Sequence, residues 1–433
     1  MGRTKRKRNK SAREPININL GTDQESINLK QWLKTQNPFY DPLHLQLRNF
    51  SATGRGVSAK KSVQPSEVLL KIPFRLLITF DSIRKSELVD YFDVGQKPLT
   101  IHTLLAVFLV MEKHKGKKSK WKNYIESLPY PEPLLPWMCN DEEFYPDELK
   151  SCAVKLQQNF EESFKNLSLN LSVLCKCCKN SLNYLLDFDM FKWAYVLVNT
   201  RAVYIDADYL ISNDNSHVSL LVDEPILALC PYLDLINHHY KARTKANVVN
   251  VDGEAFYQLI TMTGFSKYEQ IFISYGAHSN DKLFMEYGFF IPGNVFDFVK
   301  ISFKEILEIL KISLDERQYK AIKNYKFNAN EVYINQNGPS FVLKAILFVG
   351  YYPEILNYGS FIFSNRFPSD FSSVILKGTR VLLNFKLEEY KSDVRRYEDN
   401  VDDFAKLMSN YLEYRVKYVQ DLLLLLEENK LCF

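Results

Sequence analysis

Three short motifs decide the fold of this chain: Asp234–His238 (Asp-Leu-Ile-Asn-His), Ile273–Gly276 (Ile-Ser-Tyr-Gly) and Glu286–Phe289 (Glu-Tyr-Gly-Phe). The first places an Asn-His pair at the end of an apolar run, and the second is a Tyr-Gly turn that closes a β-type run. The amide of Asn237 offers a donor and an acceptor to a polar ligand, whereas His238 could be a ligand, a base or a hydrogen-bonded residue at a strand end. A single histidine is more often a hydrogen-bonded structural residue than a ligand or a base, so the role of His238 depends on the rest of the chain.

Length and composition predict a globular protein of two or three substructures, because 433 residues exceed the roughly 100 to 200 of one domain. A hydrophobic fraction of 46%, with 30 Phe and 26 Tyr, supplies a large core, and 24% charged residues keep the exterior solvated.

The positive charge is concentrated at the N-terminus, although the net charge is only +4. The residues concerned are Arg3, Lys5, Arg6, Lys7, Arg8, Lys10 and Arg13. Such a run cannot fold against a core, and it lacks the apolar segment of about 7 to 15 residues that a secretion signal requires. We therefore expect residues 1–27 to be a disordered tail that acts in nuclear localisation or touches nucleic acid, the alternative being a merely solubilising terminus.

The longest apolar stretches, Leu104–Met111 and Leu422–Leu426, fall far short of the ~18 residues that span a bilayer. We expect a soluble protein without a membrane partner.

The cysteines are odd in number, which argues for free thiols in a reducing compartment. They are Cys139, Cys152, Cys175, Cys177, Cys178, Cys230 and Cys432. Only Cys175–Cys178 suggests metal binding, but zinc takes four N or S ligands, usually as two spaced pairs, and no second Cys or His pair lies at such a spacing. We therefore expect thiols on a helix and no metal.

Hydrophobic periodicity predicts an α+β organisation. A short amphipathic helix is expected over residues 28–35 and short strands up to residue 98, followed by an all-helical insertion over 99–200. Strand character returns at 228–236, 248–251, 256–263 and 270–275, so the β-fold is completed from two separated parts of the chain. From residue 298 helical spacing dominates, and the last helix places one apolar stripe, Leu412, Val416, Val419, Leu423 and Leu426, against the core.

Two further segments carry candidate site residues. Gly54–Ala59 matches a dinucleotide fingerprint, but the strand that follows it excludes that fold, and what remains is a glycine pair that allows backbone to approach a ligand closely. Arg201, within Asn199–Tyr204, either pairs with a structural carboxylate or receives a ligand carboxylate in bidentate fashion.

In this order and spacing the motifs resemble SET-domain enzymes, specifically the split-SET class of Rubisco large-subunit lysine methyltransferase. The resemblance covers nearly the whole chain. Gly54–Gly56 is similar to the family's first cofactor loop, Thr200–Ala202 to its arginine after the insertion, and Asn237-His238 and Ser274–Gly276 to its Asn-His and catalytic tyrosine motifs. Within the class, Trp121–Tyr124, Leu128-Pro129, Asn199–Tyr204 and the basic N-terminus are similar to one branch.

The resemblance implies a SET-domain β-fold of short strands in two parts, residues 28–98 and 201–297, interrupted by the helical insertion 99–200, and an all-α substrate-binding domain over 298–433. It also implies S-adenosylmethionine (AdoMet) as cofactor. The cofactor-binding residues would be Gly54, Arg55, Gly56, Arg201, Asp234, Asn237, His238, Tyr275 and Tyr287. Tyr275 and Tyr287 would be catalytic, and Val203, Tyr204 and Phe289 would line the substrate channel.

Two alternatives stand beside lysine methylation of a protein. A relative of this class methylates a histidine in actin, but the apolar Val203 offers no polar partner for a second ring nitrogen, so lysine is favoured. A non-catalytic SET fold acting as a binding module would be expected to lose at least one of the site residues. We expect a monomer in nucleus and cytoplasm that acts on a histone or non-histone protein and touches nucleic acid, if at all, only through its tail.

Overall fold

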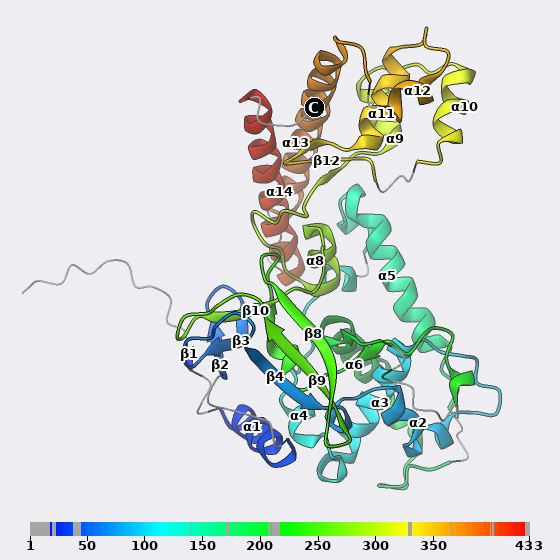
Figure 1. Ribbon diagram of the computed structural model, residues 1–433. Coiled ribbons are helices and arrows are strands. Elements are labelled where there is room, and N and C mark those ends of the chain that lie inside the picture. The colour runs from blue at the N-terminus through cyan, green and yellow to red at the C-terminus, as the bar shows by residue number, and fades with distance from the viewer. Residues whose placement is uncertain are drawn as a thin grey trace, which may run out of the picture. The chain divides into compact units, whose positions relative to one another are not determined.

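The computed structural model describes residues 18–19, 23–37, 45–139, 141–169, 173–206, 209, 217–327, 331–364, 366–398, 400 and 402–428. These residues form two compact units (Figure 1). The first contains residues 1–133 and 158–276, and the second contains 134–157 and 277–433. The basic residues between Arg3 and Arg13 lie outside the described part of the chain.

The first unit contains three small sheets. Its strands are β1 (Ile18–Asn19), β2 (Leu45–Phe50), β3 (Gly54–Ala59), β4 (Val68–Pro73), β5 (Val203–Tyr204), β6 (Leu227–Ala228), β7 (Asn237–His238), β8 (Thr244–Val251), β9 (Glu254–Thr261) and β10 (Gln270–Ile273). They pair in the orders β1-β2-β3-β10-β7, β4-β9-β8 and β5-β6. All pairs are antiparallel except β10 with β7, whose register aligns Phe272 with Asn237 and Ile273 with His238. The parallel pair brings the Asn-His and Tyr-Gly motifs to one edge.

The helices of the first unit are α1 (Gln24–Gln36), α2 (Phe80–Arg84), α3 (Ile101–Lys115), α4 (Lys122–Glu126) and α6 (Phe188–Arg201), with part of α5 (Asp147–Lys165). Helix α3 starts where the Thr100 side chain accepts the N–H of Thr103, and it ends at Gly116, whose φ of 53° suits glycine. Helix α6 packs against α3 and starts at a matching aspartate cap, Asp187. The interruption of the β-fold between residues 99 and 200 contains helices α3 to α6, with irregular segments such as 173–181 between them.

Two predicted boundaries in the first unit are wrong. Strand β1 pairs with β2, and α1 begins at Gln24, so the predicted disordered tail over 1–27 ends too late. The strand predicted over 228–236 is only β6, followed by a helical turn over Leu233–Leu235 and then β7. Pro231 cannot donate to a sheet ladder and Tyr232 adopts φ 75°, so the chain bends before the Asn-His pair.

The second unit is helical, but it also contains a three-stranded sheet that the predicted all-α region over 298–433 did not include. Its elements are α8 (Asn280–Tyr287), β11 (Val299–Lys300), α9 (Phe303–Ile309), α10 (Glu316–Asn324), β12 (Tyr333–Asn335), β13 (Gly338–Pro339), α11 (Phe341–Tyr351), α12 (Tyr358–Ile362), α13 (Phe371–Tyr397) and α14 (Asp403–Glu427). The unit starts near residue 277 rather than 298, and it takes in residues 134–157 of the predicted insertion.

The predicted apolar stripe on α14 is confirmed, because Leu412, Val419 and Leu426 are buried and Val416 and Leu423 are half-buried. Helix α14 packs along α13. Among the described helices, none combines the length and the apolar character that crossing a membrane would require.

Candidate active site

Asn237 connects β7 to the first residues of β3 and to Thr53 just before that strand. Its Nδ2 donates to the carbonyl oxygens of Thr53 and Arg55, at 3.3 and 3.2 Å. A Cβ on Gly56 would lie 2.8 Å from that same Nδ2 and 2.8 Å from Nε2 of Gln270. The glycine is thus needed because the asparagine amide occupies the space of a side chain, whereas Gly54 is needed for its φ of 65°.

Replacing Gly56 with alanine should lower the free energy of unfolding by about 1 to 3 kcal/mol, since the new methyl group displaces an amide that makes two hydrogen bonds. The matched control is Gly95→Ala, where nothing lies within 4 Å of the new Cβ and the change should stay within about 0.5 kcal/mol. Urea unfolding of both variants measures the difference. Equal stabilities would show that the Asn237 amide is free to move aside.

His238 and Tyr275 form one hydrogen-bonded unit. The buried His238 accepts the backbone N–H of Tyr275 at Nδ1, at 3.0 Å, and the two rings lie 5.1 Å apart. The hydroxyl of Tyr275 donates to the carbonyl oxygen of Ile236, also at 3.0 Å. Of the three roles that the sequence left open for His238, the structure shows a hydrogen-bonded residue at a strand end, which positions the tyrosine.

Arg201 pairs with a structural carboxylate. Its Nη1 lies 3.2 Å from Oδ2 of Asp234 and donates to the Asp234 carbonyl at 3.1 Å. The Asp234 side chain is fully buried, and Oη of Tyr124 donates to Oδ2 at 3.0 Å. Burial raises the pKa of Asp234, and Arg201 and the Tyr124 hydrogen bond oppose that shift without cancelling it.

Arg55 supplies a second guanidinium beside this pair. Burial lowers the pKa of Arg55 and the neighbouring Arg201 lowers it further, whereas the carboxylates of Asp234, Glu25 and Asp23 partly offset both. Nε of Arg201 and Oδ1 of Asp234 are buried and have no hydrogen-bond partner among the described residues. The free guanidinium N–H fits an acceptor such as a ligand carboxylate, and the free carboxylate oxygen fits a hydrogen-bond donor.

The remaining predicted residues are Val203 and Tyr204 in the first unit and Tyr287 and Phe289 in the second. Val203 and Tyr204 form β5, where Val203 is half-buried and Tyr204 is 74% exposed. Tyr287 ends α8 in the second unit, and Gly288, at φ 77°, caps that helix. The rings of Tyr287 and Phe289 lie 6.2 Å apart, edge to face.

The role of Tyr124 was not predicted from the sequence. It lies in α4, 110 residues from Asp234, and only its place in a segment typical of one branch of the family marked it. Gln270 was missed as well, although its side chain bonds Thr53 and packs beside Gly56. Neither residue belongs to a local motif that could have revealed its partner.

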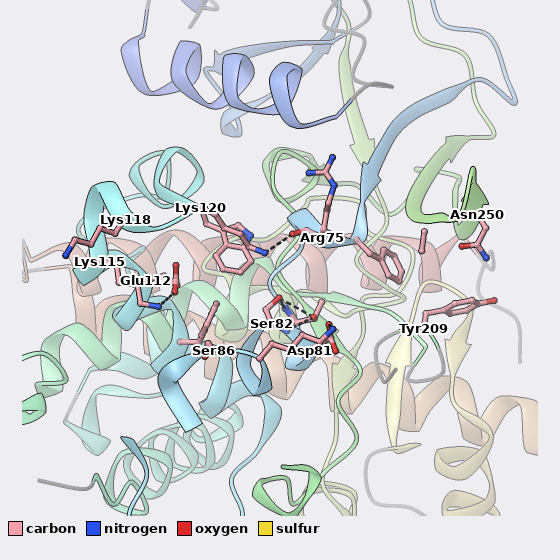
Figure 2. A pocket seen from close by; sticks show the side chains of 17 residues that line it. Arg75, Asp81, Ser82, Ser86, Glu112, Lys115, Lys118, Lys120, Tyr209 and Asn250 are labelled. Carbon is pink, nitrogen blue, oxygen red and sulfur yellow. Dashed lines mark hydrogen bonds and ion pairs between the residues drawn. The ribbon is translucent and has the colours of Figure 1, made fainter. Parts of the chain in front are cut away.

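A groove of about 1290 Å³ in the first unit contains none of the predicted site residues (Figure 2). Its wall carries several basic side chains, of which Arg75, Lys85, Lys115 and Lys120 are engaged with protein groups. Nζ of Lys115 lies 2.7 Å from Glu112, and Nζ of Lys120 donates to the Arg75 carbonyl at 3.1 Å and lies 3.9 Å from the Trp121 ring centre. We assign no ligand to it.

Comparison with known proteins agrees with this geometry. Residues 54–276 match the SET domain family. The chain is 31% identical to human SET domain-containing protein 4 over 356 residues, which covers 80% of this chain and 77% of that protein. This confirms the branch that the additional segments indicated.

Two less similar relatives are named for the methylation of different residues, one of lysine and one of histidine. A ribosomal lysine N-methyltransferase of Schizosaccharomyces pombe is 28% identical over 56% of this chain and 41% of its own length. An actin-histidine N-methyltransferase of Danio rerio is 27% identical over 63% of this chain and 43% of its own length.

The solved SET domain of Rubisco LSMT bound to lysine and AdoHcy is similar in fold, with a TM-score of 0.55 at 18% identity, over 94% of this chain and 91% of that one. The predicted α+β class, with short-strand sheets and a helical C-terminal region, is thereby confirmed. The family match over half of the chain and the similarity to SET domain-containing protein 4 lead to one conclusion: the chain belongs to the SET-domain family.

Proposed function

We propose that this protein transfers methyl groups from AdoMet to the side-chain amine of a lysine in a protein substrate. The observation that carries the proposal is the anchoring of Tyr275. His238 holds its backbone and Ile236 holds its hydroxyl, at the edge where Asn237 packs on Gly56. The match to the SET domain family and the lysine-directed relative support the proposal.

The residues present fit the cofactor. When bound, AdoMet supplies an electrophilic methyl group on a sulfonium. Its carboxylate would pair with the guanidinium of Arg201, whose Nε is buried without a partner among the described residues and which has Arg55 as a neighbour. The backbone of Gly54–Gly56, which carries no Cβ at its two glycines, and the amide of Asn237 would hold other polar edges of the same molecule.

Tyr275 would orient the acceptor amine. Its hydroxyl proton is committed to the Ile236 carbonyl, so its oxygen acts toward an amine as a hydrogen-bond acceptor. A free lysine has a pKa of about 10.4 and must lose its proton before it can attack. Burial favours the neutral amine, so no dedicated base is required. The protein's contribution is to hold nitrogen and methyl at about 3 to 3.5 Å.

The substrate is tested with tritiated AdoMet on arrays of histone and non-histone peptides. The histone arm is included because we propose nuclear as well as cytoplasmic action, on the strength of the basic residues between Arg3 and Arg13. Mass spectrometry then identifies the modified residue. Methyl-lysine supports the proposal, methyl-histidine would replace it with the activity of the actin-directed relative, and AdoMet binding without transfer to any substrate would favour a binding module.

Arg201→Ala should weaken AdoMet binding by about 10- to 100-fold, the equivalent of one charge-assisted interaction. Calorimetry measures the affinity, and a melting curve is needed beside it because the variant leaves Asp234 buried without its cation. Arg75→Ala is the matched control, since that arginine is 47% exposed and pairs with Glu254. Native AdoMet affinity in a folded Arg201→Ala variant would limit Arg201 to its structural partnership with Asp234.

A further inference from the structure

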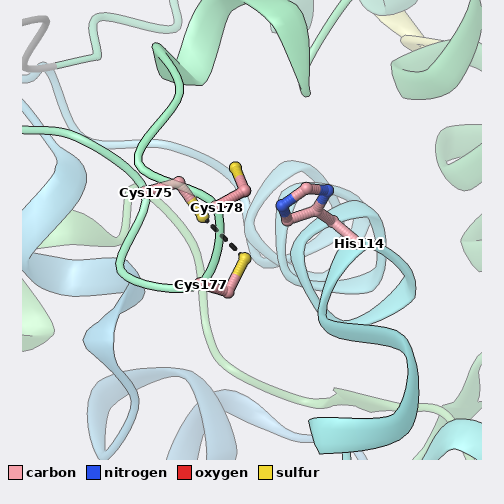
Figure 3. A group of neighbouring side chains, drawn as sticks. All are labelled: His114, Cys175, Cys177 and Cys178. Carbon is pink, nitrogen blue, oxygen red and sulfur yellow. Dashed lines mark hydrogen bonds between the residues drawn. The ribbon is translucent and has the colours of Figure 1, made fainter.

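Four side chains with metal-binding atoms gather at the end of α3 (Figure 3). They are His114, in the last turn of that helix, and Cys175, Cys177 and Cys178. One nitrogen and three sulfur atoms all lie within 4.8 Å of one another. The cysteines were expected on a helix without a further ligand. They lie instead in a turn, and the fold supplies the fourth ligand from a distant part of the chain.

The spacing is close to that of a tetrahedral metal site. Zinc–sulfur bonds of about 2.3 Å and zinc–nitrogen bonds of about 2.0 Å place ligand atoms about 3.5 to 3.8 Å apart. Sγ of Cys175 and Sγ of Cys177 are 2.9 Å apart, which is longer than the ~2.05 Å of a disulfide and shorter than the tetrahedral edge. Rotation of the side chains by a small amount would therefore make room for an ion.

The histidine of the cluster has a buried nitrogen that a metal ion would satisfy. Nε2 of His114 is buried and has no hydrogen-bond partner among the described residues. A buried imidazole nitrogen without a partner is costly, and coordination would satisfy it. Three thiols supply the other ligands, so the set is Cys3His, a known composition of closed structural zinc sites.

Backbone hydrogen bonds hold the three cysteines in a turn. The N–H of Lys179 donates to the Cys175 carbonyl at 2.8 Å, the N–H of Cys175 donates to the Asn180 carbonyl at 3.0 Å, and Lys179 adopts φ 63°, which is rare for a side chain of its kind.

The residues next to two of the ligands in the sequence tie the cluster to neighbouring elements. Nζ of Lys115 lies 2.7 Å from Glu112 and 3.2 Å from Glu87, and Nζ of Lys176 lies 3.3 Å from Asp90. The N–H of Lys176 donates to Oη of Tyr91 at 3.3 Å, which ties the turn to the same short helix.

We propose that His114, Cys175, Cys177 and Cys178 bind one Zn²⁺ ion. All four positions are taken by protein atoms, so the site is structural and leaves no position for a substrate. Binding releases the thiol protons to solvent, with no change in oxidation state. The ion joins the irregular segment 173–181 to the end of α3, inside the insertion that interrupts the β-fold. The proposal is independent of the proposed methyltransferase activity.

The test is the metal content of the full chain, purified under reducing conditions without chelator. Plasma mass spectrometry should find about one zinc per chain, and Cys177→Ser/Cys178→Ser should lower it to about a tenth or less. The matched control is Cys152→Ser, a half-buried cysteine of α5 outside the cluster, which should retain the metal. The site would be overturned if the wild-type protein contained no zinc after excess zinc was supplied, or if the double variant retained zinc.

Two measurements keep the test independent of whether the double variant folds. Cobalt-substituted wild-type protein should show the intense visible absorption of tetrahedral thiolate ligation, and His114→Asn should shift it. Alkylation followed by peptide mass spectrometry should find all three thiols protected by zinc and released by a mercurial reagent. A disulfide joining Cys175 to Cys177 in protein handled under reducing conditions would instead identify a redox pair and refute the metal site.

Discussion

Tyr275→Phe is expected to lose about 10²-fold or more in turnover while it binds AdoMet with nearly native affinity. The substitution keeps the ring beside His238 and removes only the oxygen that bonds the Ile236 carbonyl. Deleting one preorganised polar group at a reacting centre typically costs about 10²- to 10³-fold in turnover. Single-turnover methyl transfer and calorimetry measure the two quantities on the same preparation.

The matched control is Tyr184→Phe, because Tyr184 is 84% exposed in the same unit. It should leave both turnover and affinity unchanged. Tyr287→Phe should have a smaller effect than Tyr275→Phe, or should change the number of methyl groups added. A fully active Tyr275→Phe enzyme would reduce the tyrosine to a structural role and remove the catalytic assignment.

Arg415→Met is expected to destabilise the second unit by about 3 to 5 kcal/mol, the usual result of removing one partner from a buried ionic cluster. Arg415 is 1% exposed and lies 3.3 Å from Glu148, 3.4 Å from Asp297 and 3.9 Å from Asp281. It also donates to the Phe298 carbonyl and to Oη of Tyr390. Methionine retains the length of the chain but leaves these carboxylates buried without their cation.

The loss should grow as pH rises. Burial already raises the pKa values of Glu148 and Asp281 in the folded protein, and Arg415 is the strongest opposing influence on both. Without it their folded pKa values rise further above the unfolded values, so the folded state binds more protons and its stability falls with increasing pH. Unfolding curves at pH 5 and pH 8 should therefore show the larger deficit at pH 8.

Lys304→Met is the control for this experiment, because the Lys304–Glu308 pair is 80% and 64% exposed and should contribute no more than about 0.5 kcal/mol. A deficit for Arg415→Met below about 1 kcal/mol, or one that shrinks as pH rises, would mean that the carboxylates find other partners. Either outcome would contradict the role given to Arg415.

Local sequence determined the family, the α+β class and the residues around which the site is built. Gly56 is an example, because a glycine in a short motif marks a position where the backbone lies against a neighbouring side chain. The Asn-His and Tyr-Gly motifs are a second example, because they lie at the ends of strands that pair directly. Helix α3 was predictable for a similar reason, since its cap, its apolar run and its terminal glycine are all neighbours in the sequence.

The tertiary structure alone decided which of these residues meet partners from elsewhere. Asp234 is the partner of both Arg201 and Tyr124 from α4, and Arg415 pairs with carboxylates from three other segments. His114 lies beside three cysteines that no ligand spacing connects to it. Periodicity, capping and turn chemistry act over a few residues and are therefore legible in the sequence. Pairing between buried polar groups depends on where distant segments pack, because only the packed chain removes water and leaves each group to find its partner there.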